Sequence, residues 1–128
     1  MRMGEIADKA AGAQAGVAHI IGVAEAATLD GLFRERVRRT PDLVAYKHYD
    51  DTHGNWRDYT WTHMERMVAR WQAALRAEGL QPGDRVAVML RNCPEWVAYD
   101  IAALGLGLIV VPIYTQDRAE NVAYIIGH

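Results

Sequence analysis

In this 128-residue chain, the spacing of two glycines first suggests a binding site. Gly105 and Gly107 lie in LGLGLIVVPIY at residues 104–114, and this spacing is typical of a loop that cradles a dinucleotide's pyrophosphate. Such a loop follows a strand and precedes a helix, because the pyrophosphate sits on the positive end of that helix. Here a predicted helix precedes the glycines, and Val110 occupies the third glycine position. We therefore interpret the glycines as a helix end that packs tightly on a sheet, where the dipole repels phosphate.

A second group combines metal-ligand side chains in a polar turn. His48 and His53 flank Asp50 and Asp51, so a metal site is one interpretation. Flexible turn residues are the other, and we favour it because nothing nearby supplies a third ligand on a rigid element. We assign no metal.

A thiol and an arginine cluster complete the candidates. Cys93 precedes a predicted helix, whose dipole could activate it, but no histidine or second cysteine lies close in sequence. Arg36, Arg38 and Arg39 could contact an anionic partner. We favour a solvated face that complements the dipole at the end of a helix.

The composition sets limits on function. Fourteen basic and sixteen acidic residues give a net charge of −2, so charge indicates neither nucleic acid nor strong membrane attraction. A single cysteine excludes an intramolecular disulfide and suits a reducing compartment, so we expect a cytoplasmic protein. Residues 1–27 form an alanine- and glycine-rich extension, in which Glu5 and Asp8 disfavour a secretory leader. Nothing in this extension supports a peripheral membrane contact.

The elements that position these residues follow from periodicity and capping. Thr28 caps a predicted helix over 29–39, and two β-rich runs around a polar turn predict a hairpin over 43–61. Thr62 and Glu65 form a capping box for a helix that ends at Gly79. We assign its apolar stripe to the core rather than to a ligand pocket. The stripe consists of Met64, Met67, Val68, Trp71, Ala74 and Leu75.

The second half predicts a strand, a helix and a strand. RVAVML at 85–90 reads as a strand buried on both faces, and LIVVPIY at 108–114 as its parallel partner. Asn92 or Cys93 caps the helix between them, and Asp117 with Glu120 starts a last helix. The apolar side of the central helix carries Trp96, Val97, Ile101 and Leu104. The fold class is α/β, a hairpin and a right-handed parallel βαβ unit flanked by helices.

The order of these segments resembles the N-terminal region of the adenylate-forming enzymes: acyl-CoA synthetases, luciferases and peptide-synthetase adenylation domains. YTWTHM at 59–64 is similar to the family's leucine-threonine-tyrosine-x-glutamate-leucine element, with Trp61 at the tyrosine and His63 at the acid. LGLGLIVVPIY resembles the second core motif but has Leu106 for alanine and Tyr114 for aspartate. The ending VPIY is similar to the long-chain fatty-acyl-CoA synthetase branch. The resemblance covers about residues 28–128.

The resemblance implies a two-step ligase that uses ATP, coenzyme A and Mg²⁺. A fatty acid forms an acyl-adenylate, and coenzyme A then displaces AMP. The family's phosphate loop, adenine pocket and catalytic lysine lie further along the chain, and the lysines here are Lys9 and Lys47. We therefore expect residues 28–128 to be a truncated AMP-binding domain that is inactive alone. We expect no catalytic, cofactor-binding or metal-binding residues in it, and leave substrate-binding residues unassigned.

The resemblance also implies a homodimer through aliphatic surface that later segments would cover. An alternative is a free-standing oligomerisation module built on the same βαβ core. A small nucleotide-binding domain is a weaker alternative. Acyl chain length, the role of residues 1–27 and continuation of the gene past His128 are left open.

Overall fold

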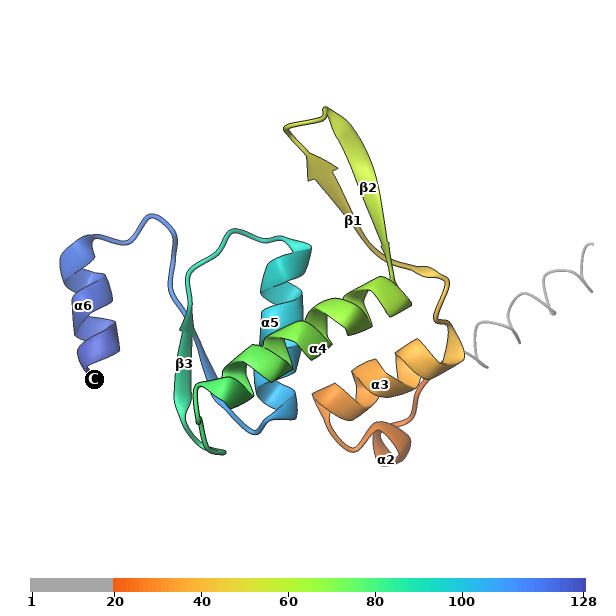
Figure 1. Ribbon diagram of the computed structural model, residues 1–128, viewed down its shortest axis with the longest axis horizontal. Coiled ribbons are helices and arrows are strands. Elements are labelled where there is room, and N and C mark those ends of the chain that lie inside the picture. Colours follow the sequence, from red (N-terminus) through yellow and green to blue (C-terminus); the bar gives the residue numbers. More distant parts are fainter. Residues whose placement is uncertain (1–19) are drawn as a thin grey trace, which may run out of the picture.

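The computed structural model describes residues 20–128 (Figure 1), so most of the expected extension lies outside the described residues. No helix in the described part is long and apolar enough to cross a membrane. The elements are α2 (Val23–Ala26), α3 (Leu29–Arg39), β1 (Val44–Asp50), β2 (Asn55–Thr60), α4 (Trp61–Ala77), β3 (Arg85–Val88), α5 (Pro94–Gly105), β4 (Ile109–Pro112) and α6 (Ala119–Gly127).

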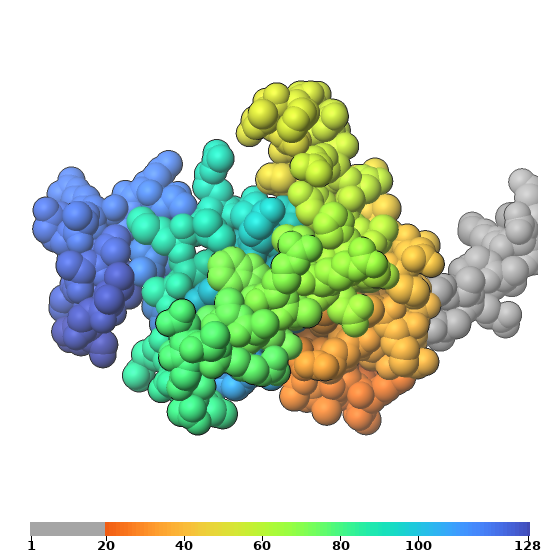
Figure 2. Space-filling view, in the orientation of Figure 1, coloured from red at the N-terminus to blue at the C-terminus, as the bar shows by residue number. Residues whose placement is uncertain are grey.

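The predicted α/β class is confirmed, with one antiparallel hairpin and one parallel strand pair. β1 pairs with β2, and β3 pairs in parallel with β4 across the crossover helix α5. α4 lies over α5, the hairpin projects from the N-terminal end of α4, and α6 lies on the far side of β3 (Figures 1 and 2). The centre of the core is the α4–α5 contact, where Met64, Ala98, Ala102 and Ala103 are 0% exposed.

The glycines close α5, as predicted. Gly107 has a φ of +72°, its N–H donates to the Leu104 carbonyl at 3.0 Å, and the Leu108 N–H donates to the Ala103 carbonyl at 3.0 Å. This pair of bonds is the Schellman ending of a helix. The Gly107 carbonyl then accepts from the Gly83 N–H at 2.8 Å, which ties the helix end to the turn before β3.

Gly105 permits the predicted tight packing of α5, but the elements that pack against it are the helices α3 and α4 and not the sheet. A β-carbon at this position would lie 2.5 Å from Gln72 Nε2 of α4 and 2.6 Å from Asp30 Oδ1 of α3. The prediction of packing on the sheet was therefore wrong in its partner. The missing side chain lets α3 and α4 converge on the end of α5.

The two capping boxes are corrected by the structure. Thr60, not Thr62, caps α4, because its hydroxyl accepts from the His63 N–H at 3.2 Å, while the Thr62 hydroxyl donates to the Pro41 carbonyl at 3.0 Å. β2 runs directly into α4, which makes Thr60 the last extended residue. The Trp61 N–H also donates to the Leu43 carbonyl at 3.1 Å.

The last helix likewise begins later than its predicted box. α6 follows Arg118, and the Asp117 N–H donates to the Tyr114 carbonyl at 3.0 Å within the preceding turn. Asp117 therefore belongs to that turn and does not cap the helix.

The burial of β3 and α5 also differs from prediction. Val86 and Val88 are buried, whereas Arg85 and Ala87 are exposed, so β3 is covered on one face because its sheet has only two strands. α5 buries its small residues against α4, since alanines permit a close approach of the two helices. Apart from Tyr99, which is buried, its larger apolar residues are only half-buried; these are Trp96, Val97, Ile101 and Leu104.

Two helix-ending glycines provide a matched test of the junction. Gly79 and Gly107 both have φ near +70°, but a β-carbon on Gly79 meets nothing within 4 Å, while one on Gly107 lies 3.2 Å from Pro82 Cβ. We expect Gly79→Ala to cost about 1 kcal/mol through backbone strain. Gly107→Ala adds the Pro82 contact and should cost about 2 kcal/mol or more. Urea unfolding measures both, and equal costs would contradict the crowding at Pro82.

Candidate functional site

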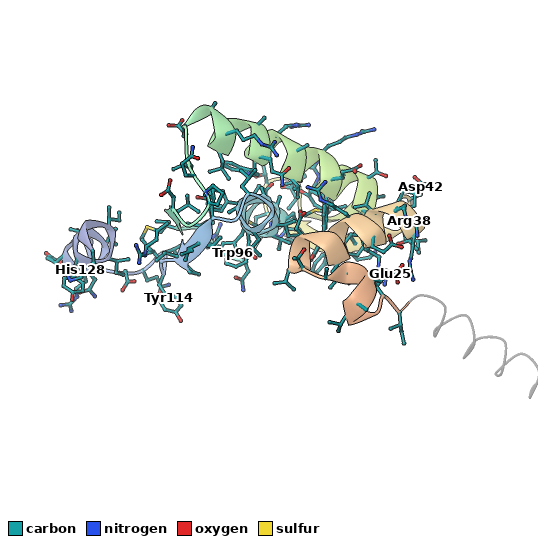
Figure 3. All side chains as sticks on the ribbon, turned by 90° about the horizontal axis from the view of Figure 1, so that it is seen from below. Glu25, Arg38, Asp42, Trp96, Tyr114 and His128 are labelled. Carbon is teal, nitrogen blue, oxygen red and sulfur yellow. The ribbon has the colours of Figure 1, made fainter. Side chains whose placement is uncertain are left out.

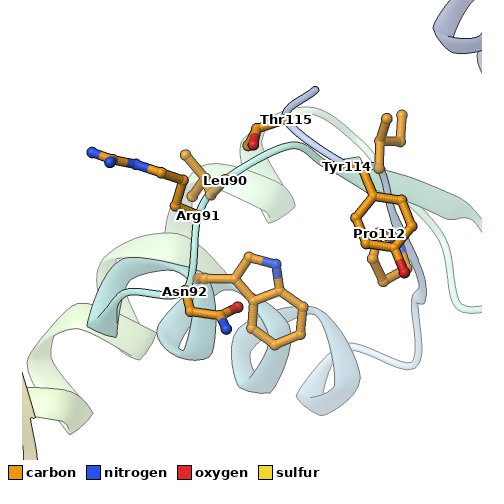
Figure 4. A pocket seen from close by; sticks show the side chains of 8 residues that line it. Leu90, Arg91, Asn92, Pro112, Tyr114 and Thr115 are labelled. Atoms are coloured by element: carbon orange, nitrogen blue, oxygen red, sulfur yellow. The ribbon is translucent and has the colours of Figure 1, made fainter. Parts of the chain in front are cut away.

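A hollow of about 660 Å³ lies at the carboxyl ends of β3 and β4 (Figure 4). Open α/β sheets bind ligands at this edge, so the hollow is the candidate site. The loop after β3, the first turn of α5, the last residue of β4 and the segment that follows it supply its lining. The lining residues are Leu90, Arg91, Asn92, Trp96, Pro112, Ile113, Tyr114 and Thr115.

The lining of the hollow can contact a ligand but offers little chemistry. Asn92 and Tyr114 lie on opposite sides of it (Figure 4), and Arg91 is its one cation. None of the eight lining residues is an acid, a histidine, a cysteine or a lysine. No buried side-chain nitrogen or oxygen within residues 20–128 lacks a hydrogen-bond partner. The hollow therefore fits a contact surface for an aromatic or anionic group and contains no general base.

The glycines lie at the other end of the strand pair. Gly107 and Gly83 are joined before β3 and β4 begin, whereas the hollow follows the last residues of both strands. The predicted order of helix, glycines and strand is confirmed, and the glycines face the carbonyl end of α5.

In the hairpin turn one aspartate and one histidine meet, Asp50 and His53, but the four side chains do not converge on one point. Asp50 Oδ1 accepts from the Thr52 and His53 N–H groups at 3.0 and 3.2 Å, and Asp50 Oδ2 lies 2.8 Å from His53 Nδ1. The hydrogen bond from the His53 side chain lowers the pKa of Asp50. The described contacts bring neither His48 nor Asp51 to this pair, and no group of three metal-ligating side chains gathers in residues 20–128. Hydrogen bonds within the turn therefore engage both oxygens of the Asp50 carboxylate.

The arginine cluster is directed at nearby carboxylates. Arg38 Nη2 and Arg39 Nε lie 2.5 and 2.6 Å from Glu35 Oε1, and Arg39 also pairs with Glu25 of α2. The hydrogen bonds from Arg38 and Arg39 lower the pKa of Glu35 to about 2. The favoured interpretation of a solvated helix face therefore holds for Arg38, whose side chain is 70% exposed, but not for Arg39, whose side chain is 20% exposed and ties α3 to α2. Arg36 instead lines a groove between α3 and α5.

Cys93 precedes α5 without making a side-chain capping bond. Burial raises the pKa of its thiol, and Glu95 adds to this, outweighing the backbone hydrogen bond from Trp96 that lowers it. The weaker interpretation, a thiol activated by the helix dipole, is contradicted because desolvation dominates at this position.

Half of the apolar stripe of α4 is core; the prediction was wrong for Trp71 and Ala74, which are exposed, and Met67 is half-buried. Met64, Val68 and Leu75 are buried, while Trp71 sits at the surface and meets Tyr99 edge-on at 5.1 Å. Sequence reasoning missed Gln72, which is buried and whose Nε2 donates to the Ala102 carbonyl at 3.5 Å. Sequence reasoning also missed the lining of the hollow. Ligands bind at the carboxyl ends of the strands in open α/β sheets, and this rule could have indicated the lining.

The Glu35 cluster predicts a pH dependence of stability. A carboxylate whose folded pKa is depressed stabilises the fold above its unfolded pKa and loses this contribution as the pH falls through the folded pKa. We expect the Glu35→Gln chain to be less stable than the parent at pH 6 and nearly equal to it at pH 2. Urea unfolding between these pH values measures the difference. Glu65→Gln is the control, and a difference that stays constant down to pH 2 would contradict the cluster.

The Cys93 environment predicts slow alkylation. At pH 8 iodoacetamide should react with the folded chain several-fold more slowly than with the same chain in denaturing urea, because burial disfavours the thiolate. Glu95→Gln should speed the reaction of the folded chain by removing a charge that raises the pKa. Equal rates in the folded and unfolded chains would show that the thiol is neither buried nor perturbed.

Comparison with known proteins identifies the family of this chain. Residues 33–128 match the family described as AMP-binding enzyme. The long-chain-fatty-acid–CoA ligase FadD15 of Mycobacterium bovis is 34% identical over 92 residues, covering 72% of this chain and 15% of that ligase. The chain therefore spans about one seventh of the length of this relative.

Solved structures share the fold. The crystal structure of CmiS6 aligns with a TM-score of 0.71 and 27% identity, covering 77% of this chain and 25% of that one. The Mycobacterium tuberculosis fatty acyl CoA synthetase aligns with a TM-score of 0.67 and 30% identity, covering 76% of this chain and 18% of that one. The chain belongs to the AMP-binding enzyme family and resembles the N-terminal part of AMP-forming acyl-CoA ligases.

Proposed function

We propose that this chain is the N-terminal structural portion of an ATP-dependent long-chain fatty acid–CoA ligase. The observation that carries the proposal is the 34% identity to a long-chain ligase over 92 residues. In the proposed reaction a fatty-acid carboxylate attacks ATP, giving an acyl-adenylate and pyrophosphate. The thiol of coenzyme A then displaces AMP and forms the thioester. The ending VPIY supports long acyl chains as substrates.

Within this reaction the described residues supply scaffold rather than chemistry. Lys47 is the one lysine of residues 20–128, and its Nζ lies 3.1 Å from Asp58 in the hairpin. The hollow does not fit a complex of Mg²⁺ and ATP, because its lining has no carboxylate to hold the metal and a single cation to face the phosphates. ATP, coenzyme A and Mg²⁺ are therefore proposed for the whole ligase and not for this chain.

Other properties of the proposed ligase remain predictions. The cytoplasmic location, the homodimer and the boundary of an extension at residue 27 rest on composition and family resemblance alone. The free-standing oligomerisation module gains no support from the ligase relatives named above.

The proposal predicts that the chain is inactive alone but functions when grafted. Incubated with hexadecanoate, ATP, Mg²⁺ and coenzyme A, the chain should release no pyrophosphate above the buffer rate. The graft replaces the aligned segment of the M. tuberculosis fatty acyl CoA synthetase with the matching residues of this chain. It should keep activity within about tenfold of the host, because the two folds align at a TM-score of 0.67. Turnover by the chain alone, or a folded graft without activity, would contradict the proposal.

A further inference from the structure

A short strap, which we define as residues 20–27 and which includes α2, lies along α3 (Figure 1). At one end of α3, Arg39 Nη1 donates to the Ile20 carbonyl at 3.1 Å. At the other end, the Ala26 carbonyl oxygen lies against the backbone of Gly31. The strap therefore follows the length of α3 and contacts both of its ends.

The strap can lie this close because residue 31 is a glycine. A β-carbon on Gly31 would lie 1.9 Å from the Ala26 carbonyl oxygen, a distance that non-bonded atoms cannot reach. Gly31 lies within α3, where glycine is among the least favourable residues for a helix. The closed strap therefore explains a glycine that the helix alone would disfavour.

The joint between the strap and α3 is strained. Ala27 has φ 58° and ψ −40°, and within residues 20–128 it is the one non-glycine residue with a positive φ. The Thr28 N–H donates to the Ala26 carbonyl at 2.6 Å, which closes a three-residue turn of the rare, strained kind. Backbone strain of this sort persists only where other contacts hold it. The joint therefore opposes the closed strap.

The contacts that hold the strap closed are few and mainly polar. No residue of α2 is buried, and Ile20 and Val23 are 67% and 88% exposed. Arg39 pairs with Glu25 in addition to its bond with the Ile20 carbonyl. In the view turned by 90°, Glu25 lies beside the end of α3 that carries Arg38 (Figure 3). A segment with so little buried apolar surface opens at a low free energy, and salt weakens its exposed ion pair.

We propose that residues 20–27 are a conformational switch, a strap that Arg39 closes on α3 and that its strained joint opens when anions compete for Arg39. Opening uncovers one side of Leu29 and Leu32, which line a hollow of about 350 Å³ together with the strap. The switch thus couples the ionic conditions at Arg39 to the exposure of apolar surface on α3. It does not depend on the proposed ligase reaction.

Hydrogen exchange of the backbone amides in residues 20–28 of the full chain measures the opening. Gly31→Ala places a β-carbon against the strap and should speed this exchange at least about tenfold. Ala27→Gly removes the strain and should slow it about fivefold, because glycine adopts a positive φ freely. Ala26→Gly is the matched control, since the same substitution within α2 should speed exchange. Residues 64–75 of α4 report on global unfolding.

A second pair of variants tests the hold of Arg39. Arg39→Gln should speed exchange of the strap about fivefold by removing its bonds to Glu25 and Ile20. Arg38→Gln is the matched control and should stay within about twofold of the parent, because the described hydrogen bonds of Arg38 go to Glu35 alone. Raising sodium chloride from about 0.05 to about 0.5 M should speed exchange in the parent and leave Arg39→Gln unchanged.

Three results would overturn the switch. The first is a strap that exchanges as slowly in Gly31→Ala as in the parent, with α4 intact in both. The second is an Ala27→Gly chain that exchanges faster than the parent, as Ala26→Gly should. This comparison decides the proposal even where Gly31→Ala unfolds the whole chain. The third is an Arg39→Gln chain that matches Arg38→Gln at both salt concentrations.

Discussion

The close approach of three helices at Gly105 is the constraint on which the rest of the structure depends. Gln72 of α4 and Asp30 of α3 occupy the space that a side chain at this position would fill. Arg34 holds the Asp30 carboxylate at 2.7 Å, and Gln72 reaches the Ala102 carbonyl, so both neighbours are themselves fixed. Two residues later the chain reverses at Gly107 and enters β4. The same short segment thus sets the helix packing and the start of the parallel strand pair.

Local signals in the sequence predicted most elements because they act within a few residues. Thr28 caps α3 through a 2.9 Å bond to the Gly31 N–H, as its position before the apolar run indicated. The capping boxes at Thr62 and Asp117 failed for a different reason. The Thr62 hydroxyl instead donates to the Pro41 carbonyl, and the backbone N–H of Asp117 donates to the Tyr114 carbonyl in the turn before α6. Capping patterns identify the residues that can start a helix, whereas the neighbouring strand or turn selects among them.

Periodicity identified the apolar residues of α5 but not the face that α4 covers. Both faces are apolar, and the choice between them depends on residue size, since the alanines permit a closer approach than Trp96 or Ile101. The residues of the candidate site were even harder to predict from the sequence. Arg91, Asn92 and Thr115 follow no period, and only the parallel pairing of β3 with β4 brings the two loops to one edge. Family resemblance supplied neither the covered face of α5 nor this lining; it identified the family from the order of the segments.

The passage from β2 into α4 has a mechanical consequence. No loop residue separates Thr60 from Trp61, and the start of α4 is bonded to Leu43 and Pro41, the segment that leads into β1. A hinge requires a few residues that can absorb a change of φ and ψ, and this joint contains none. Hairpin and helix therefore form a rigid elbow. The direction of the hairpin is therefore set by the first turn of α4, the helix that packs on the alanines of α5.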